Sequence, residues 1–267
     1  MLADELIRQL AEELVDAEET GVWIEPISDR FEDADVTDAY RVGIVVAEIK
    51  QQRGRRIRGH KIGLTSKAMR DLMAATEPDY GFLYDNWFVP EGSTLDRTRM
   101  NRPLVEVELA FVMKHQLGGA DVHAADVIRA TDFVLPSIEI VDSRFVRRGS
   151  RSLIDSISDS ASCGAVVLGG NPIGLNDIDP RRISGSLVIN GQVVESGSAA
   201  AVMGNPINAV AWLARKLDEF GVALEAGDVV LSGSFIRAIP FQAGDTVVAL
   251  FDQLGEVVLD IGPRSTP

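Results

Sequence analysis

Hydrophobic and polar residues alternate through residues 104–112, which read LVEVELAFV and predict a β-strand. Because successive strand side chains point to opposite faces, Glu106 and Glu108 share one face, about 6–7 Å apart along the chain. The apolar residues at the alternate positions are expected to enter the core. Two acids side by side on one face repel each other unless something positive lies between them.

A second apolar run, residues 133–141, places Glu139 between two isoleucines. An acid is rarely buried in such a run unless it is paired or binds a metal. If the two strands are neighbours, Glu106, Glu108 and Glu139 supply three carboxylates to one divalent cation, which takes oxygen ligands. Two alternatives remain open: a solvated strand face for the first two acids, and a salt bridge from Glu139 to Arg144 or another basic residue.

Helical periodicity dominates the N-terminal part of the chain. Leucines at every fourth position predict an amphipathic helix over residues 2–19. A second helix is predicted over residues 37–52, with Thr37 as its N-cap and Gly54 as its stop signal. These two segments predict a helical N-terminal region.

The segment after these helices predicts a short strand over 57–62, a glycine turn and a helix from Ser66. Lys61 lies two residues before Gly63, where backbone or ligand can approach closely. Near a metal, Lys61 is a candidate general acid–base, and Asp79 in a predicted turn is its candidate partner. A nearby metal favours the neutral amine of Lys61, whereas Asp79 favours the ammonium. Together they should leave the pKa of Lys61 above neutrality but below its ordinary value of about 10.4. The alternatives are a solvated lysine and a plain turn aspartate.

The later part of the chain predicts further strands with two helices between them. Asn-Gly between two apolar runs is a strong hairpin signal. The polar segment 144–164 is predicted to be a long loop and a candidate lid over the site. The other expected elements are helices over 124–130 and 206–219, a strand over 165–170, the hairpin over 187–195, and strands over 228–235, 245–251 and 257–261.

The composition limits which classes of binding partner and which cellular compartment we expect for this protein. The chain has 267 residues, 46% of them hydrophobic, which suits one large domain or a domain with an N-terminal appendage. Asp and Glu total 40 against 26 Lys and Arg, and the net charge of −14 argues against nucleic-acid and membrane partners. The single cysteine, Cys163, allows no intrachain disulfide and is expected to be a small buried residue. With no signal-peptide pattern and no run of about 20 apolar residues, we expect a cytoplasmic location.

The sequence also argues against several enzyme classes. It contains neither G-x-S-x-G nor G-x-G-x-x-G, so serine-hydrolase and dinucleotide-binding interpretations have no support. Its three histidines, at positions 60, 115 and 123, lack the spacing of a zinc site.

Several stretches together resemble the hydratases of aromatic meta-cleavage pathways in the fumarylacetoacetate hydrolase superfamily. The resemblance covers nearly the whole chain in order. It implies an α+β fold with a mixed β-roll around the metal site, a requirement for Mg²⁺ or Mn²⁺, and a homo-oligomer that could be a decamer. It divides the chain into an N-terminal helical region, 1–72, that contributes Lys61, and a metal-binding β-roll catalytic domain, 73–267. The matching stretches are 59–66, 78–81, 105–111, 139–144, 155–159, 210–214 and 232–235.

The resemblance also implies roles for individual residues. The metal ligands of the superfamily fall on the three glutamates named above, and its lysine–aspartate pair falls on Lys61 and Asp79. Two departures affect how the distal end of a substrate is held: Leu104 stands where relatives usually have arginine, and the loop at 160–163 reads SASC. The candidate substrate-binding residues are Thr65, Leu83, Arg144, Ser162 and Ser234, with Arg147 or Arg148 as further candidates for a distal carboxylate.

The activity implied by this resemblance is that of a hydro-lyase. Water would add at C4 of a 2-hydroxy-2,4-dienoate or its 2-oxo-4-enoate form to give a 4-hydroxy-2-oxo acid, with 2-oxo-hept-4-ene-1,7-dioate as the first expected substrate. Hydration of 2-oxopent-4-enoate and decarboxylation of 4-oxalocrotonate are the nearest alternatives. Remoter ones are C–C hydrolysis of an acylpyruvate and, from another class, a non-catalytic acidic scaffold.

Overall fold

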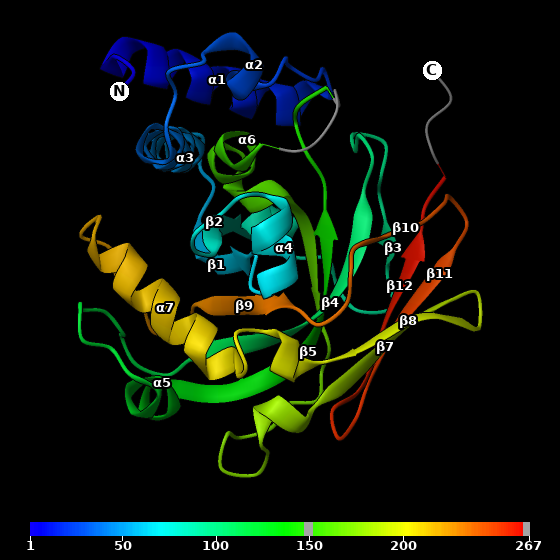
Figure 1. Ribbon diagram of the computed structural model, residues 1–267. Coiled ribbons are helices and arrows are strands. Elements are labelled where there is room, and N and C mark those ends of the chain that lie inside the picture. The colour runs from blue at the N-terminus through cyan, green and yellow to red at the C-terminus, as the bar shows by residue number, and fades with distance from the viewer. Residues whose placement is uncertain (147–151, 264–267) are drawn as a thin grey trace.

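Two β-sheets, both mixed in strand direction, form the body of an α+β fold, which confirms the expected fold class (Figure 1). The structure is a computed structural model that describes residues 1–146 and 152–263. Its helices are α1 (Asp4–Thr20), α2 (Ile27–Arg30), α3 (Val36–Gln52), α4 (Lys67–Leu72), α5 (Ala124–Ala130), α6 (Leu153–Ser158) and α7 (Pro206–Asp218). In Figure 1, α1, α2, α3 and α6 lie across the top, whereas α5 and α7 lie at the lower left.

Within the described residues, the larger sheet has seven strands in the order β2-β1-β9-β4-β5-β6, with β10 paired to β4. Strands β1 and β9 run parallel, whereas the other pairs in this sheet are antiparallel. Its strands are β1 (Ile57–Gly63), β2 (Asp79–Tyr84), β4 (Leu104–Met113), β5 (Thr131–Val141), β6 (Cys163–Leu168), β9 (Val229–Ser234) and β10 (Ile239–Pro240).

The smaller sheet packs on the apolar face of β4. Val105 and Val107 are 0% exposed, and a Cβ at Gly185 would lie 2.8 Å from a methyl group of Val107. The opposite face of β4, which carries Glu106 and Glu108, is thereby turned away from the smaller sheet. This sheet has the order β3-β12-β11-β7-β8, with β3 (Thr94–Leu95), β7 (Ser184–Ile189), β8 (Gln192–Ser198), β11 (Thr246–Phe251) and β12 (Gly255–Ile261).

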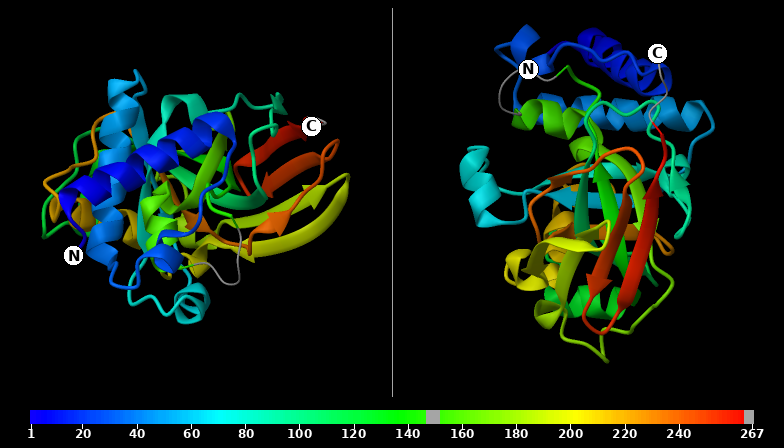
Figure 2. Two further views of the ribbon diagram at one scale, coloured as in Figure 1. Left: turned by 90° about the horizontal axis from the view of Figure 1, so that it is seen from above. Right: turned by 90° about the vertical axis from the view of Figure 1, so that its right-hand side faces the viewer.

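The N-terminal helices form a layer with its own apolar core, in which α1 packs on α3, and α3 also contacts α6 (Figure 2). Both predicted helices are confirmed to within two residues. The N-cap of α3 is Asp35, so the prediction of Thr37 was wrong. The Asp35 side chain accepts a hydrogen bond from the Asp38 N–H at 2.8 Å, and Asp38 reciprocates in a capping box, which leaves Thr37 inside the helix.

Strand β1 belongs to the larger sheet, where it lies between β2 and β9. Its parallel pairing places Gly59 opposite Val229 and Lys61 opposite Leu231. The sheet therefore crosses the boundary predicted at residue 72, and the sheet itself rather than the helical layer supplies Lys61.

The segment 144–164 contains helix α6 and a short turn, so the prediction of one long loop was wrong. Asp155 of α6 accepts hydrogen bonds from the N–H and the hydroxyl of Ser28 at 3.1 and 2.6 Å, which ties α6 to the N-terminal layer. The predicted positions Arg147 and Arg148 lie outside the described residues.

Other sequence-based elements are confirmed. Asn190 and Gly191 form the turn between β7 and β8 with φ values of 51° and 78°, both positive as a type I′ turn requires. Helix α7 begins after Asn205, whose side chain accepts a hydrogen bond from the Ile207 N–H at 3.1 Å.

Across the two described ranges, no helix is long and apolar enough to cross a membrane.

Replacing Gly59 by alanine should destabilise the protein by about 3 kcal/mol or more. Gly59 has a φ of +140°, and a Cβ there would lie 1.9 Å from the Val229 carbonyl oxygen, inside the β1–β9 pairing. Gly54→Ala is the matched control, because Gly54 also has a positive φ but nothing within 4 Å of an added Cβ. Its expected loss is about 1 kcal/mol. Chemical denaturation measures the free energy of unfolding of both variants, and equal losses in Gly59→Ala and Gly54→Ala would contradict the steric argument.

Candidate active site

The register of β4 and β5 brings the predicted acids together. The two strands pair antiparallel, with Glu106 directly opposite Glu139 and Glu108 opposite Ser137. Residues that are directly opposite point to the same face of a sheet, so all three glutamates project from one face. The predicted neighbourhood of the two strands is therefore confirmed.

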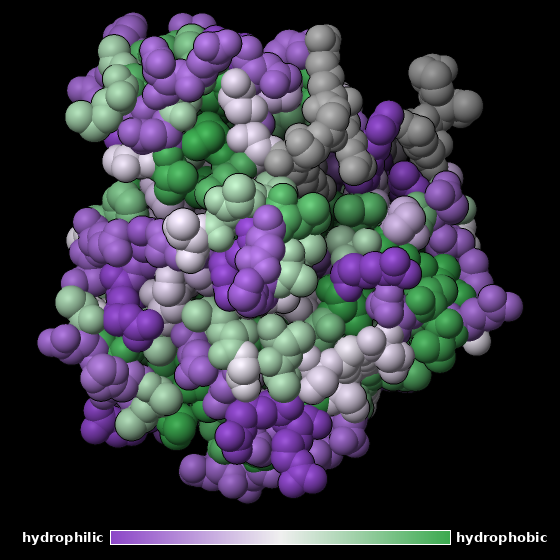
Figure 3. Space-filling model, viewed as in Figure 1, coloured by the Kyte–Doolittle hydropathy of each residue, from purple (hydrophilic) through white to green (hydrophobic). Residues whose placement is uncertain are grey.

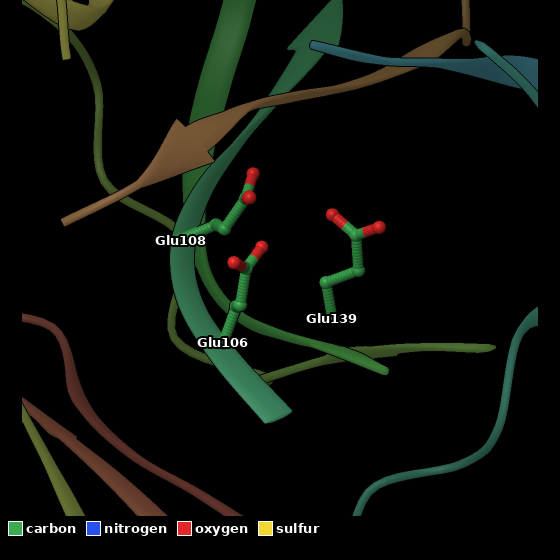
Figure 4. A group of neighbouring side chains, drawn as sticks. All are labelled: Glu106, Glu108 and Glu139. Carbon is green, nitrogen blue, oxygen red and sulfur yellow. The ribbon is translucent and has the colours of Figure 1, made fainter. Parts of the chain in front are cut away.

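The three carboxylates face one another across a small space (Figure 4). One oxygen from each lies within 4.8 Å of the oxygens of the other two. Glu108 is 1% and Glu139 0% exposed, whereas Glu106 is half-buried. Repulsion between such charges grows as the local dielectric falls, and a cluster of carboxylate oxygens is the donor set that hard divalent cations take. These residues therefore fit a metal.

Glu108 illustrates the electrostatic difficulty of the cluster. Its Oε2 accepts a hydrogen bond from the Gly233 N–H at 2.8 Å. Burial, followed by the negative charges of Glu139 and Glu106, holds the pKa of Glu108 well above its usual value, although Lys61 and the Gly233 N–H act in the opposite direction. Ionisation of all three acids together therefore requires additional positive charge nearby.

Lys61 reaches the acids from β1. Its Nζ lies 3.0 Å from Glu139 Oε1 and donates a hydrogen bond to the Ala161 carbonyl oxygen at 2.9 Å. Glu139 thus pairs with Lys61 and not with Arg144. At 4% exposure, Lys61 is no solvated surface lysine. Burial lowers the pKa of Lys61, but the nearby carboxylates, Glu139 first, raise it above its usual value. The predicted lowering of this pKa depended on a nearby metal. Without one, the several acids around a single ammonium raise the pKa of Lys61 instead.

Asp79 begins β2 and lies directly opposite Gly63, with 1% exposure, so it is not in the predicted turn. Its Oδ2 accepts a hydrogen bond from the Ser156 hydroxyl at 2.9 Å. A Cβ at Gly63 would lie 2.2 Å from Asp79 Oδ1, so the glycine provides the space that this carboxylate occupies. The negative charge of Asp79 contributes to the raised pKa of Lys61.

Two of the predicted substrate-binding residues lie next to Glu108 and its backbone donor. Ser234 pairs with Glu108 between β9 and β4, and its hydroxyl donates to the Ile236 carbonyl oxygen at 2.9 Å. Thr65 is buried against Gly233, where an added Cβ would lie 2.3 Å from its hydroxyl oxygen. Because Gly233 donates to Glu108, Thr65 supports the end of β9 that binds this acid.

Two more predicted residues lie on the side of Lys61. Leu83 is fully buried and pairs with Gly59, so it shares the sheet face of Lys61. Ser162 is buried in the turn that follows α6, and its carbonyl oxygen accepts a hydrogen bond from the Asp142 N–H at 2.8 Å. Ser162 directly follows Ala161, whose carbonyl oxygen accepts the hydrogen bond from Lys61.

Arg144 lies apart from the cluster of acids. Its Nε donates to the Asp159 carboxylate, and its Nη1 donates to the Cys163 carbonyl oxygen at 2.7 Å. Arg144 lines a separate cavity of about 360 Å³ together with Trp87, and none of the three glutamates is among the described residues that line it. Cys163 is confirmed as a small buried residue, and burial raises the pKa of its thiol.

Sequence reasoning assigned no role to two groups that contact the predicted pair. One is the Ser156 hydroxyl, which bonds to Asp79, and the other is the Ala161 carbonyl, which accepts from Lys61. A backbone carbonyl carries no side-chain signal. The serine is one of many in a polar segment, so neither could be singled out from residue type.

The chain is similar to known proteins over most of its length. The family profile described as fumarylacetoacetate (FAA) hydrolase C-terminal matches residues 52–261. The chain is 41% identical to 2-oxo-hept-4-ene-1,7-dioate hydratase of Escherichia coli, covering 93% of this chain and 95% of that protein. It is 35% identical to 2-keto-4-pentenoate hydratase of Burkholderia vietnamiensis, with 96% and 98% coverage.

A solved structure is similar over nearly the entire fold. It is 4-oxalocrotonate decarboxylase from Pseudomonas putida G7, complexed with magnesium and adipate, which superposes with a TM-score of 0.94 at 35% identity. The superposition covers 98% of this chain and 99% of that one. With the family profile spanning most of its length and relatives matching it almost end to end, the chain belongs to the fumarylacetoacetate hydrolase family.

Proposed function

We propose that this enzyme is a hydro-lyase that converts a 2-hydroxy-2,4-dienoate, or its 2-oxo-4-enoate form, to a 4-hydroxy-2-oxo acid in aromatic meta-cleavage catabolism. The observation that carries the proposal is the meeting of three carboxylates with the buried ammonium of Lys61 on one sheet face. The hydratase names of the full-length relatives support this reaction, and 2-oxo-hept-4-ene-1,7-dioate is the first candidate substrate.

The charge balance of the cluster supports a divalent cation held by Glu106, Glu108 and Glu139. Glu139 is 0% exposed, and within the described residues its one ion-pair partner is Lys61, at 3.0 Å. Mg²⁺ and Mn²⁺ are the candidates because they prefer carboxylate oxygen. When bound, the cation would supply Lewis-acid stabilisation for negative charge on the 2-oxo oxygen of the substrate.

Lys61 is the proposed proton carrier. Ketonisation of the dienol requires a proton at C5 and removal of the proton from the 2-hydroxyl group, which leaves a 2-oxo-3-enoate. Water then places its hydroxyl group on C4 and C3 gains a proton, so the net change is addition of one water. The ammonium of Lys61, held by the Ala161 carbonyl with Asp79 nearby, is suited to move these protons.

The walls of the site supply the remaining contacts in this proposal. Thr65, Ser162 and Ser234 are candidate hydrogen-bond donors to the substrate, and Leu83 is a candidate apolar contact. The contacts of Arg144 with Asp159 and its place in a separate cavity support a different role from the predicted one of binding a distal carboxylate.

Decarboxylation is the second candidate, and the similarity to the solved decarboxylase structure favours it. Both reactions pass through an enolate of a 2-oxo acid, so one site can serve either. Decarboxylation releases CO₂ and hydration does not. Hydrolysis of a carbon–carbon bond would instead cut the carbon chain into two products.

Purified enzyme with Mg²⁺ should convert dienoates to 4-hydroxy-2-oxo acids without loss of carbon. The panel should pair each substrate that has a second carboxylate with one that lacks it, because chain length and the distal group distinguish the candidate hydratases. Mass spectrometry identifies the product, and a CO₂ assay runs alongside. Stoichiometric CO₂, or two shorter products, would replace hydration by one of the other reactions.

Removing one acid should weaken metal binding and, without metal, stabilise the fold. We expect Glu108→Gln to lose more activity than the ~10–100-fold typical of residues that only support a ligand. In EDTA the same variant should be more stable than the wild type, because burial and the neighbouring acids raise the pKa of Glu108 and so make its ionised form unfavourable in the folded protein. Calorimetric titration with Mg²⁺ and denaturation in EDTA measure the two effects.

The control for this experiment is Glu256→Gln, at an exposed position of β12. It should change neither metal affinity nor stability appreciably. Activity of the wild type that persists fully in EDTA, or Mg²⁺ binding that survives in Glu106→Gln, Glu108→Gln and Glu139→Gln alike, would contradict the metal site. Absence of saturable Mg²⁺ binding by the wild type would favour the acidic scaffold.

Lys61→Ala should lower kcat by at least ~10²-fold, the range of a removed general acid–base, with little change in Mg²⁺ affinity. Asp79→Asn should be impaired as well. The double variant should be little worse than Lys61→Ala, because the two residues act as one unit. Steady-state kinetics and calorimetry of all four proteins measure this. Fully additive losses, or a normal kcat for Lys61→Ala, would assign the proton transfer to another group.

Assembly into a homo-oligomer and a cytoplasmic location complete the proposal. Exposed apolar residues on the smaller sheet support an interface between copies: Val193, Val194 and Leu250 are 63%, 40% and 40% exposed. Figure 3 shows apolar surface on this side of the molecule, at the right of the view. Light scattering measures the mass in solution, and a monomer would contradict the oligomer.

A further inference from the structure

A turn with unusual backbone conformation lies directly beside Lys61. Ser160, Ala161 and Ser162 have φ values of 50°, 50° and 60°, in the left-handed region that favours glycine. For residues other than glycine this conformation costs about 1–2 kcal/mol each, so three in succession persist only where surrounding contacts hold them. We call residues 160–162 the left-handed turn.

The left-handed turn presents one backbone atom to the proposed proton carrier. The carbonyl oxygen of Ala161 accepts the hydrogen bond from Lys61 Nζ at 2.9 Å. The turn closes on itself through the Ser162 N–H, which donates to the Asp159 carbonyl oxygen at 2.8 Å. The position of the Ala161 carbonyl, and with it one of the contacts of Lys61, therefore depends on this conformation.

Arg144 binds both ends of the left-handed turn. Before the turn, its backbone N–H and its Nε donate to the two oxygens of the Asp159 carboxylate, and its Nη2 donates to the Asp159 carbonyl oxygen at 2.7 Å. After the turn, its Nη1 donates to the Cys163 carbonyl oxygen at 2.7 Å. Arg144 is 5% and Asp159 4% exposed, and charge-assisted hydrogen bonds of this kind are strong and directional.

The opposite side of the turn rests on a glycine. Gly81 pairs with Lys61 across β1 and β2, and a Cβ on Gly81 would lie 2.1 Å from the carbonyl carbon and oxygen of Ser160. The turn is therefore held between Arg144 on one side and the bare backbone of Gly81 on the other. Any side chain at Gly81 would displace it.

The surroundings of Arg144 connect it to the N-terminal helical layer. Its guanidinium carbon lies 5.5 Å from the centre of the Trp87 ring. The Trp87 indole N–H donates to Glu18 of α1 at 2.9 Å, and Glu18 also pairs with Lys50 of α3. Three of the five N–H groups of the Arg144 side chain donate to Asp159 and Cys163, the residues that flank the turn. Arg144 also lines the cavity of about 360 Å³ described above, to which none of the three clustered glutamates contributes among the described residues.

We propose that Arg144 is a positioning residue that, with Asp159, holds the left-handed turn so that the Ala161 carbonyl keeps Lys61 in place for proton transfer. The inference rests on the proposed role of Lys61. It replaces the predicted contact between Arg144 and a distal carboxylate of the substrate. Arg144 acts through the turn, because its hydrogen bonds go to Asp159 and Cys163 on either side of it.

Two variants test the bond between Arg144 and the turn. Arg144→Lys keeps the charge but cannot reach both ends of the turn, and the double variant Arg144→Gln/Asp159→Asn keeps a hydrogen-bonding pair without a buried charge. Each should lower kcat by about 10-fold or more, whereas KM and Mg²⁺ affinity should stay within about threefold. In the Lys61→Ala background the same changes should lower kcat by less than about threefold, because the residue through which they act is gone.

Gly81→Ala tests the turn from its other side. It should also lower kcat by about 10-fold or more, and its effect should likewise shrink in the Lys61→Ala background. Gly43→Ala is the matched control, because a Cβ there would meet only the Ile157 carbonyl oxygen at 3.4 Å, an ordinary contact. Hydrogen exchange gives a readout independent of activity: the Ser162 N–H should exchange faster in the variants at Arg144 and Gly81 than in Gly43→Ala.

The outcomes separate this inference from the proposed function. A wild type with no metal-dependent turnover would overturn the proposed function and the catalytic part of this inference together. A wild type with normal turnover and variants with unchanged kcat would overturn the inference alone. So would a raised KM confined to substrates with two carboxylates, which would mark Arg144 as a substrate ligand. Losses as large in Lys61→Ala as in the wild type would also overturn it, because they would reduce Arg144 to a purely structural role.

Discussion

Mutual repulsion between three carboxylates is the constraint around which this molecule is built. Two of them are almost completely buried, in an environment where a bare negative charge is strongly unfavourable. The chain compensates with the ammonium of Lys61, which pairs with Glu139, and with the Gly233 N–H, which donates to Glu108. It also leaves a space between the acids. A site so arranged favours additional positive charge, and the same excess of negative charge raises the pKa of the lysine.

Glycines make this density of charged groups sterically feasible. At Gly63 the carboxylate of Asp79 occupies the place of a side chain, and at Gly81 the left-handed turn does so. At Gly233 it is the side chain of Thr65. In each case a glycine on one strand lets a functional group from another element approach to a distance that no other residue would allow. The site is therefore specified as much by missing side chains as by the acids and the lysine.

The sequence predicted those parts of the site that depend on local pattern. Alternation placed Glu106 and Glu108 on one face, and the apolar run around Glu139 marked it as a buried acid. The placement of Lys61 between β2 and β9 depends on pairing between segments far apart in the chain, which periodicity does not encode. Arg144 was misleading because residue type shows that a guanidinium seeks an anion, but not whether that anion is a substrate or Asp159.

The direct opposition of Glu106 and Glu139 fixes which residues meet, but it places no such demand on the length of chain between them. That connection runs through α5 at the outside of the sheet, as Figure 1 shows. Closing a longer loop costs only about 0.6 kcal/mol for each doubling of its length. A single residue inserted within either strand would instead turn one acid to the opposite face. The fold should therefore tolerate a change in the length of the connection through α5 more readily than a change in the number of residues inside β4 or β5.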